Sequence, residues 1–306
     1  LFYVALQVAL LTRRQSSIVM PSLFRFLSVV PLPLAHLLGA AMGWIAWLCS
    51  PTYRKRFAAN STQAGYRFAQ VRPAIAHAGR MVAELPRLWL KDTAVNAVHG
   101  TECVEQGWAK GKGILFLTPH LGCFELSVQG AANLWSAEHG PITILYRPAK
   151  QAWLAEMMLT ARNRSGIQAV PTTLAGVRQM IKALRKGQAV GLLPDQVPPH
   201  GQGQWAPFFG KDAYSMTLAA RLALQTGATV ILVRCVRLPA GRGYELFFEA
   251  LPAQLSSDLD TAVVQINQAM EHTIRQCPEQ YLWGYGRYKQ PRREAAVSAD
   301  AEGGAQ

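Results

Sequence analysis

A run of 28 residues without one charged side chain, from Phe26 to Tyr53, constrains this chain more than any other feature. Pro31 and Pro33 divide the run and leave Leu34–Ser50 as a helix whose only strongly polar side chain is His36. A helix that is apolar all round lies either in a protein core or in a membrane. Spanning a bilayer takes about 20 apolar residues. The segment therefore predicts a membrane anchor, spanning or interfacial, with a buried core helix as the alternative.

The positive charge of the chain is concentrated near this run. The net charge is +13, and residues 1–100 hold 11 Lys and Arg residues against two acids, Glu84 and Asp92. Positive charge that follows an apolar helix indicates an anionic membrane surface as partner and a cytoplasmic flank. No zinc-finger, homeodomain-like or RNP-type pattern accompanies the charge, so nucleic acid is not expected as a partner. The five cysteines show no Cys-x-x-Cys spacing, which favours a reducing compartment over a disulfide framework or a metal site.

Three regions follow from these patterns: an anchor region over residues 1–51, one α/β domain over 52–289, and a disordered tail over 290–306 that lacks apolar periodicity. Helices are predicted from Phe124, after Thr173 and from Asp258. Strands that alternate with helices predict a mixed sheet flanked by helices. The predicted strands are Gly113–Thr118, Ile142–Tyr146, Ala189–Pro194, Ala228–Val236 and Glu245–Leu251.

His120 and Glu125 lie at the junction between the first of these strands and the helix from Phe124. A histidine at such a junction can take a proton, and a carboxylate one turn on can hold its tautomer and stabilise the imidazolium. A buried structural histidine is the alternative. Cys123 lies between the two, and a nucleophilic role for it, with His120 as its base, is less favoured than a filler role.

Further polar residues follow other predicted strands. Arg147 follows Tyr146, Arg162 and Arg164 lie at the end of a helix, and Asp195 opens a Pro/Gly-rich loop that runs to Gly210. In an α/β sheet, ligands collect at the carboxyl ends of strands, so His120, Arg147 and Asp195 are expected to meet at one rim. Surface ion pairing is the alternative for the arginines, and an Asx turn for Asp195.

The ordered segments T-P-H-L-G-C-F-E, Y-R-P, R-N-R-S-G, P-D-Q, F-F-G and P-E-Q-Y-L-W resemble the lipid A biosynthesis lauroyl/myristoyl acyltransferases. These belong to the wider lysophospholipid acyltransferase group with its H-x4-D/E motif. The resemblance covers Val29 to Lys289 and implies the fold of that group. It places His120 and Glu125 at the catalytic dyad and the family's important arginine at Arg162 or Arg164. Asp195 takes the position of the aspartate in the family's P-D motif, and it is expected to bind substrate together with the arginines.

The resemblance implies a bacterial inner-membrane enzyme that faces the cytoplasm. Such an enzyme transfers a fatty acyl group from acyl carrier protein to a hydroxyl of a phosphorylated, Kdo-bearing lipid A precursor, with no cofactor and no metal. His120 would act as general base, and the backbone N–H groups near Gly122 and Cys123, or an arginine, would hold the developing oxyanion. The stretch Val197–Gly201 departs from the family pattern, which leaves the donor chain length open. Trp205, Phe208 and Phe209 would line the acyl-chain groove or, equally, pack in the core.

Three other functions compete with this interpretation. The same fold acting on a lysophospholipid or another glycolipid is one, and a catalytically idle membrane lipid-binding module is another. A serine hydrolase or thioesterase is disfavoured, because the sequence has no G-x-S-x-G nucleophile elbow.

Overall fold

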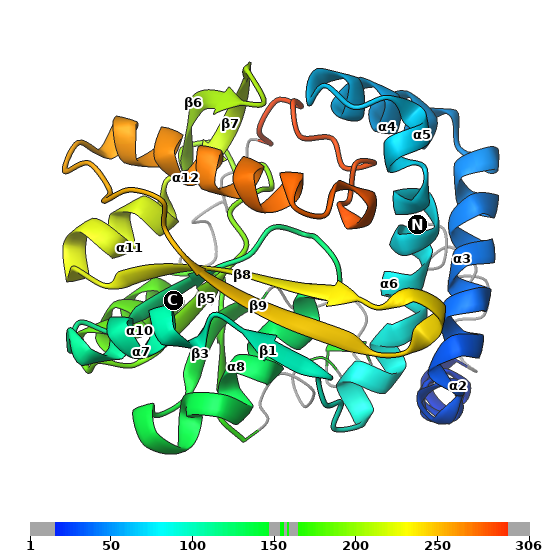
Figure 1. Cartoon of the computed structure of the whole chain (residues 1–306), viewed down its shortest axis with the longest axis horizontal. Helices are drawn as coiled ribbons and strands as arrows, with labels where there is room; N and C mark the ends of the chain where they lie inside the picture. The colour runs from blue at the N-terminus through cyan, green and yellow to red at the C-terminus, as the bar shows by residue number, and fades with distance from the viewer. Residues whose placement is uncertain (1–15, 147–153, 156–157, 159–164, 293–306) are drawn as a thin grey trace, which may run out of the picture.

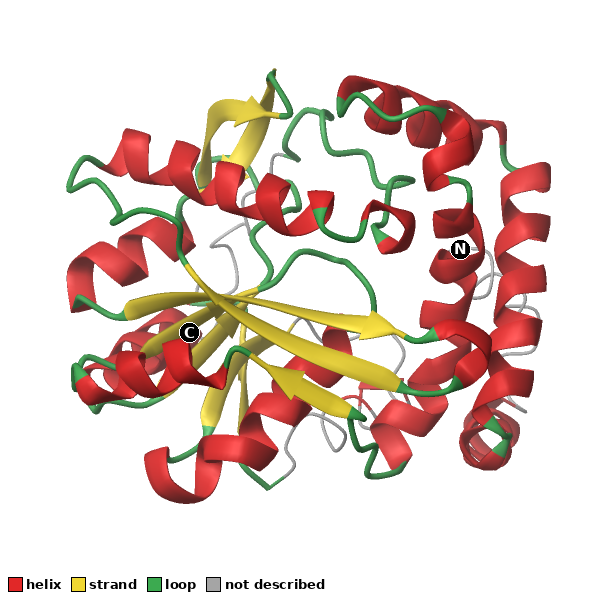
Figure 2. Ribbon diagram, viewed as in Figure 1, coloured by secondary structure: helices red, strands yellow, loops and turns green. Residues whose placement is uncertain are grey.

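A central seven-stranded sheet organises the computed structural model, which describes residues 16–146, 154–155, 158 and 165–292 (Figures 1 and 2). The predicted tail lies outside the described residues from 293 onward. The strands stand in the order β1-β9-β8-β2-β5-β3-β4. Their bounds are β1 Ala97–His99, β2 Ile114–Leu117, β3 Ile142–Tyr146, β4 Ile167–Pro171, β5 Ala189–Leu192, β8 Thr229–Arg237 and β9 Tyr244–Ala250.

Most of this sheet is parallel. Strands β8, β2, β5, β3 and β4 pair parallel to one another, β9 pairs antiparallel to β8, and β1 pairs parallel to β9. The predicted mixed α/β sheet is therefore confirmed. Each of the five predicted strands is present, with ends shifted by no more than two residues, because each is a short apolar run bounded by turn residues.

Helices cover both faces of the sheet. Along β2, Leu115 and Leu117 enter one hydrophobic cluster and Ile114 and Phe116 the other, as the period of two in a strand requires. The first cluster takes side chains from α10 Leu174–Arg185, α11 Leu218–Thr226 and α12 Leu259–Arg275, and the second from α7 Thr101–Ala109 and α8 Phe124–His139.

Within the described residues, the five helices from α2 to α6 form a further layer at one end of the sheet, at the right of Figure 1. Helix α3 is the predicted apolar helix, and it lies on the outer edge of the molecule with α6 between it and the sheet. The bounds are α2 Ser16–Val29, α3 Leu32–Cys49, α4 Pro51–Gln63, α5 Phe68–Val71 and α6 Pro73–Leu90; two 3-10 turns, η2 Pro239–Gly241 and η3 Pro278–Gln280, lie against α3 and α6 respectively.

The Pro/Gly-rich loop predicted up to Gly210 contains regular structure. Strand β6 Gly203–Phe208 pairs antiparallel with β7 Lys211–Met216 in a separate hairpin. The sequence did not predict β6, because it contains Gly203 and Pro207 and both residue types are depleted in strand interiors. A two-stranded ribbon that stands apart from the main sheet accommodates them.

Candidate active site

Two neighbouring strands deliver His120 and Asp195 to the same place. Strands β2 and β5 pair in parallel, and the N–H of Thr118 extends their ladder by donating to the carbonyl of Leu192 at 3.1 Å. The segments that leave the two strands therefore start side by side at the carboxyl rim of the sheet, where ligands of α/β proteins collect. The prediction that His120 and Asp195 share this rim is confirmed.

Both carboxylate oxygens of Asp195 form hydrogen bonds with His120. Oδ1 lies 2.7 Å from the ring Nδ1, and Oδ2 accepts the backbone N–H of His120 at 2.9 Å. Asp195 is buried, with 2% of its side chain exposed, whereas the side chain of His120 remains 19% exposed. The carboxylate is thus withdrawn from solvent while the imidazole keeps an opening to it.

Electrostatics fix which nitrogen of His120 carries the proton. Burial alone would raise the pKa of Asp195, but the charge of His120 and two hydrogen bonds from it, helped by Arg287, lower that pKa below its usual value. An ionised carboxylate can only accept, so Nδ1 must be the donor, which leaves Nε2 of the neutral ring as the acceptor. His120 therefore presents a base at Nε2.

Glu125 lies in the first turn of α8 and is partly buried. The sequence assigned the control of the His120 tautomer to this residue, but the carboxylate at Nδ1 is that of Asp195. Asp195, expected to bind substrate, is thus placed to position the base. The catalytic role of Glu125 stays a prediction.

The backbone N–H groups of Leu121, Gly122 and Cys123, in the turn after His120, all donate within the protein. Gly122 has φ +56, and a Cβ there would come within 2.0 Å of the carbonyl oxygen of Cys235. The N–H of Gly122 donates to the carbonyl of Gln280 at 3.1 Å, and that of Cys123 donates to Cys235 at 2.7 Å. The N–H groups of Gly122 and Cys123 themselves are therefore not available to an oxyanion, because protein carbonyls already occupy them; Arg147, Arg162 and Arg164 lie outside the described residues.

Cys123 is a filler residue, as the sequence favoured. Its side chain is 1% exposed, and burial, together with the neighbouring Cys235, raises the pKa of its thiol well above the usual value. The nucleophilic form of cysteine is the thiolate. A buried thiol that resists ionisation does not attack a substrate.

The segment Pro278–Trp283 clamps the turn from the other side. Leu121 and Tyr281 form an antiparallel bridge, and the N–H of Leu282 donates to the carbonyl of His120 at 3.2 Å. The Gln280 side chain accepts the N–H of Arg237 and donates to its carbonyl, both at 3.0 Å. The sequence shows this segment as a motif, but it does not show that Gln280 binds the backbone of Arg237, because the two residues lie more than 40 positions apart.

Arg287 lies close enough to Asp195 for its charge to act on that carboxylate. Its guanidinium is 2% exposed and donates to the Tyr214 carbonyl at 2.8 Å and to the Ser215 hydroxyl at 2.7 Å. Its charge contributes to the low pKa of Asp195. The remaining predicted site residues, Arg147, Arg162 and Arg164, lie outside the described residues. Within the described ranges, no group of three or more His, Cys, Asp or Glu residues could hold a metal ion.

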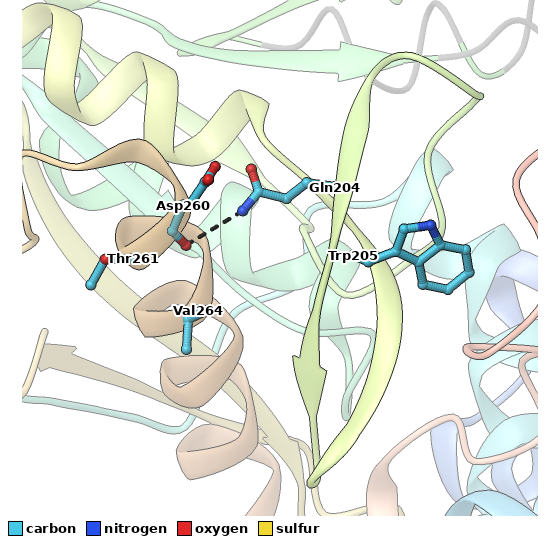
Figure 3. A pocket seen from close by; sticks show the side chains of 5 residues that line it. All are labelled: Gln204, Trp205, Asp260, Thr261 and Val264. Atoms are coloured by element: carbon cyan, nitrogen blue, oxygen red, sulfur yellow. Dashed lines mark hydrogen bonds between the residues drawn. The ribbon is translucent and has the colours of Figure 1, made fainter.

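Two of the three aromatic residues singled out in the hairpin pack in the core. Phe208 and Phe209 are 2% and 5% exposed and belong to the core, so core packing is confirmed for them. Trp205 is 47% exposed and lines an open surface pocket of about 430 Å³ between β6 and the start of α12. The amide of Gln204 crosses this pocket to the carbonyl of Asp260 at 3.4 Å (Figure 3). Neither His120 nor Asp195 lines it.

Comparison with known proteins gives matches to one family. The family model described as bacterial lipid A biosynthesis acyltransferase matches residues 18–290. The chain is 27% identical over 195 residues to a lipid A biosynthesis palmitoleoyltransferase and 30% identical over 196 residues to a lipid A biosynthesis lauroyltransferase, both of Escherichia coli K12.

A lipid A biosynthesis acyltransferase of Haemophilus influenzae is 27% identical over 187 residues, which is 60% of this chain and 56% of that relative. The two matches in Escherichia coli each cover 63% of this chain and 61% of the relative. The chain therefore spans somewhat less than two thirds of the length of these relatives.

Proposed function

Because the chain belongs to the family of bacterial lipid A biosynthesis acyltransferases, we propose that it is an O-acyltransferase of lipopolysaccharide synthesis. It moves a fatty acyl chain from acyl carrier protein to a hydroxyl of a phosphorylated, Kdo-bearing lipid A precursor. The reaction takes place at the cytoplasmic face of the bacterial inner membrane, to which residues 1–51 attach the acyltransferase domain over 52–289. The observation that carries the proposal is the partly exposed His120 ring with Asp195 bound to Nδ1.

His120 acts as the general base. Nε2 takes the proton of the acceptor hydroxyl as its oxygen attacks the thioester carbonyl, and the C–S bond breaks as the tetrahedral intermediate collapses. The carrier thiolate leaves and receives the proton from the imidazolium, which yields the ester and the free thiol. A positioned base contributes about 10²- to 10⁴-fold to such a step. The thioester is already activated, so no acyl-enzyme is required.

Asp195 stabilises the imidazolium that forms during the reaction. Its carboxylate is buried, ionised and bonded at 2.7 Å to Nδ1, which keeps the positive ring paired in a low-dielectric surrounding. Glu125, in the first turn of α8, completes the dyad of the H-x4-E motif. Arg147 and the Arg162–Arg164 segment bind the acceptor phosphates through bidentate contacts, and one of these arginines holds the oxyanion.

The test is acyl transfer by purified variants, with acyl carrier protein as donor. His120→Ala and Glu125→Ala abolish transfer, while thermal unfolding and membrane attachment stay near those of the unmodified protein. His200→Ala, in an exposed loop, is the matched control and retains activity. Near-normal transfer by His120→Ala would overturn the mechanism.

A second measurement addresses the acceptor. Mass spectra of lipid A are compared between cells with and without the protein, and the mass difference names the acyl chain added. An unchanged acyl count overturns the lipid A acceptor and points to a lysophospholipid or another glycolipid.

A further inference from the structure

Helices α2 and α3 each expose large apolar side chains at the outside of the molecule. On α3 the exposed positions recur every three or four residues, which places them on one stripe. Two of them, Leu37 and Leu48, are more than 60% exposed. The large apolar side chains of this surface, called here the apolar stripe, are Leu23, Phe26, Val29, Leu34, Leu37, Leu38, Met42, Ile45 and Leu48.

The exposed charges on the helices from α2 to α6 are all positive. The sequence has no acidic residue before Glu84, and Glu84 is buried. The basic side chains Arg25, Lys55, Arg56, Arg67 and Arg72 are exposed on α2 and on the segments that follow α3. An apolar face flanked by these cations complements an anionic lipid surface, where hydrocarbon and phosphate meet.

The opposite face of α3 is locked onto α6 by glycines. A Cβ on Gly43 would lie 2.2 Å from the carbonyl oxygen of Ile75, and one on Gly79 would lie 1.9 Å from that of Gly39. The two backbones therefore touch along the middle of both helices. At the start of α3, a Cβ on Gly241 of η2 would lie 2.6 Å from Cα of Pro33. Helix α3 is attached to the domain over its whole length.

A buried ionic cluster reinforces this attachment. Nε2 of His36 in α3 lies 3.1 Å from Glu84 in α6, and Nε of Arg237 donates to both oxygens of Glu84 at 2.9 and 3.1 Å. The hydroxyl of Tyr244 donates to the same carboxylate at 3.0 Å. Breaking the contact of α3 with α6 would remove one partner of a carboxylate that is 1% exposed, which is costly.

We propose that α3 does not cross the bilayer: α2 and α3 lie flat on an anionic lipid surface, with the apolar stripe among the acyl chains. A spanning α3 would put its two ends on opposite sides of a hydrocarbon core about 30 Å thick. Its two ends are held by the same folded domain, at η2 and at α4, so both stay on one side. This inference rests on the membrane location in the proposed function and adds the mode of attachment.

The flat arrangement also places the active site near its lipid acceptor. Strand β8 runs toward α6 (Figure 1), and its last residue, Arg237, bonds Glu84 there. His120 leaves the neighbouring strand β2 in the same direction. The carboxyl rim and the apolar stripe thus lie toward the same end of the molecule.

The decisive experiment measures depth in the membrane along the stripe. Nitroxide labels are placed at Leu34→Cys, Leu37→Cys, Ile45→Cys and Leu48→Cys, in a background with Cys49→Ser and Cys103→Ser, because the other three cysteines are buried. The protein is bound to vesicles of phosphatidylcholine and phosphatidylglycerol, and accessibility to oxygen and to a nickel chelate gives each depth. Lys182→Cys, exposed on α10, is the water-facing control.

A flat α3 gives four similar, shallow depths, although Leu34 and Leu48 lie about 21 Å apart along the axis at 1.5 Å per residue. A profile that is deepest between Leu37 and Ile45 and shallow at both ends shows a spanning helix and overturns the proposal. Labels that remain as accessible to the nickel chelate as the control label also overturn it. So do labels that become protected without lipid, in a dimer of the protein.

Binding strength provides an independent readout. The double variant Leu37→Asp and Ile45→Asp loses two inserted side chains, and its partition to these vesicles falls about 100-fold. Leu174→Asp is the matched control, because that leucine is 78% exposed on α10 and lies off the stripe; unchanged partition of the double variant would sink the proposal. The His120→Ala protein must show the same depths, so a failure of catalysis and a failure of attachment are told apart.

Discussion

Two of the histidine–carboxylate pairs have a buried carboxylate, and they differ in what they can do. His120 and Asp195 meet at 2.7 Å at the carboxyl rim of the sheet, and His36 and Glu84 meet at 3.1 Å between α3 and α6. In the first pair the histidine is 19% exposed and its carboxylate has been pulled inside; in the second both side chains are 5% exposed or less. A pair of this kind can do chemistry only where one ring nitrogen is within reach of a substrate.

The partners of the two carboxylates explain the difference further. Burial alone would raise the pKa of Glu84, but the charge of Arg237 and the hydrogen bonds from His36 and Arg237 lower it to about 2. Arg237 in turn has a pKa raised by Glu84 despite its own burial. Glu84 therefore belongs to a permanent ion pair, whereas Asp195 binds the base itself. We expect mutation of Asp195 to lower activity and mutation of Glu84 to lower stability.

Of the substitutions at the two buried carboxylates and their partners, Asp195→Asn is expected to have the largest effect. An amide can offer N–H to Nδ1, which moves the proton of the ring to Nε2 and removes the base, so acyl transfer falls roughly 10²- to 10⁴-fold. Steady-state transfer rates with acyl carrier protein as donor measure this. Asp212→Asn, on the exposed start of β7, serves as control; an Asp195→Asn enzyme as fast as that control contradicts the positioning role.

Glu84→Gln is expected to act on stability. It leaves the guanidinium of Arg237 buried without its anion, which costs roughly 3–5 kcal/mol of unfolding free energy. Denaturant unfolding at neutral pH measures the loss. The matched control is Glu249→Gln, in an exposed pair with Arg234 and His272, for which at most about 1 kcal/mol is expected. Equal losses of unfolding free energy in Glu84→Gln and Glu249→Gln would contradict the special role of the buried ion pair.

The same carboxylate predicts how stability depends on pH. The pKa of Glu84 is about 2 in the folded protein against the ordinary value of 4.5, so its contribution is complete above pH 4.5 and is lost as the pH falls toward 2. Unfolding followed from pH 6 to pH 3 should show this loss in the unmodified protein and a weaker one in Glu84→Gln. A steeper fall in the variant runs against the assignment.

The smallest effect is expected at Tyr244→Phe. This change deletes one neutral donor to the buried carboxylate and leaves Arg237 and His36 in place, so the cost is about 1.5–3 kcal/mol. Thermal unfolding detects it. Acyl transfer at a temperature well below unfolding should be unchanged, and a selective loss of transfer would show that the two clusters are not separable.

Local sequence patterns predicted most of the regular structure. Strand β3 and the helix starts at Leu174 and Leu259 are where the pattern puts them, because Thr173 and Asp258 cap the helices with their own side chains. Strand β1, with three residues, and β4 were missed, since each depends on a partner strand. The β6–β7 hairpin was missed because its first strand contains a glycine and a proline.

The active site was predicted only in part, for a related reason. The strand-to-helix position of His120 follows from residues next to it in the chain, and so does the burial of Cys123. The N–H groups of Gly122 and Cys123 looked available in sequence because their acceptors, the carbonyls of Gln280 and Cys235, come from segments more than 100 residues away.

By itself, the sequence determined that an apolar, cation-rimmed helix precedes an α/β domain and that a histidine and a glutamate five positions apart open one of its helices. Periodicity and capping act over a few residues, so they are legible in the chain. Only the tertiary structure decided that Asp195, 75 residues from His120, is the carboxylate on its ring, and that α3 is bound along its length to α6. Strand order and close backbone approach bring these groups together, and neither leaves a local signal.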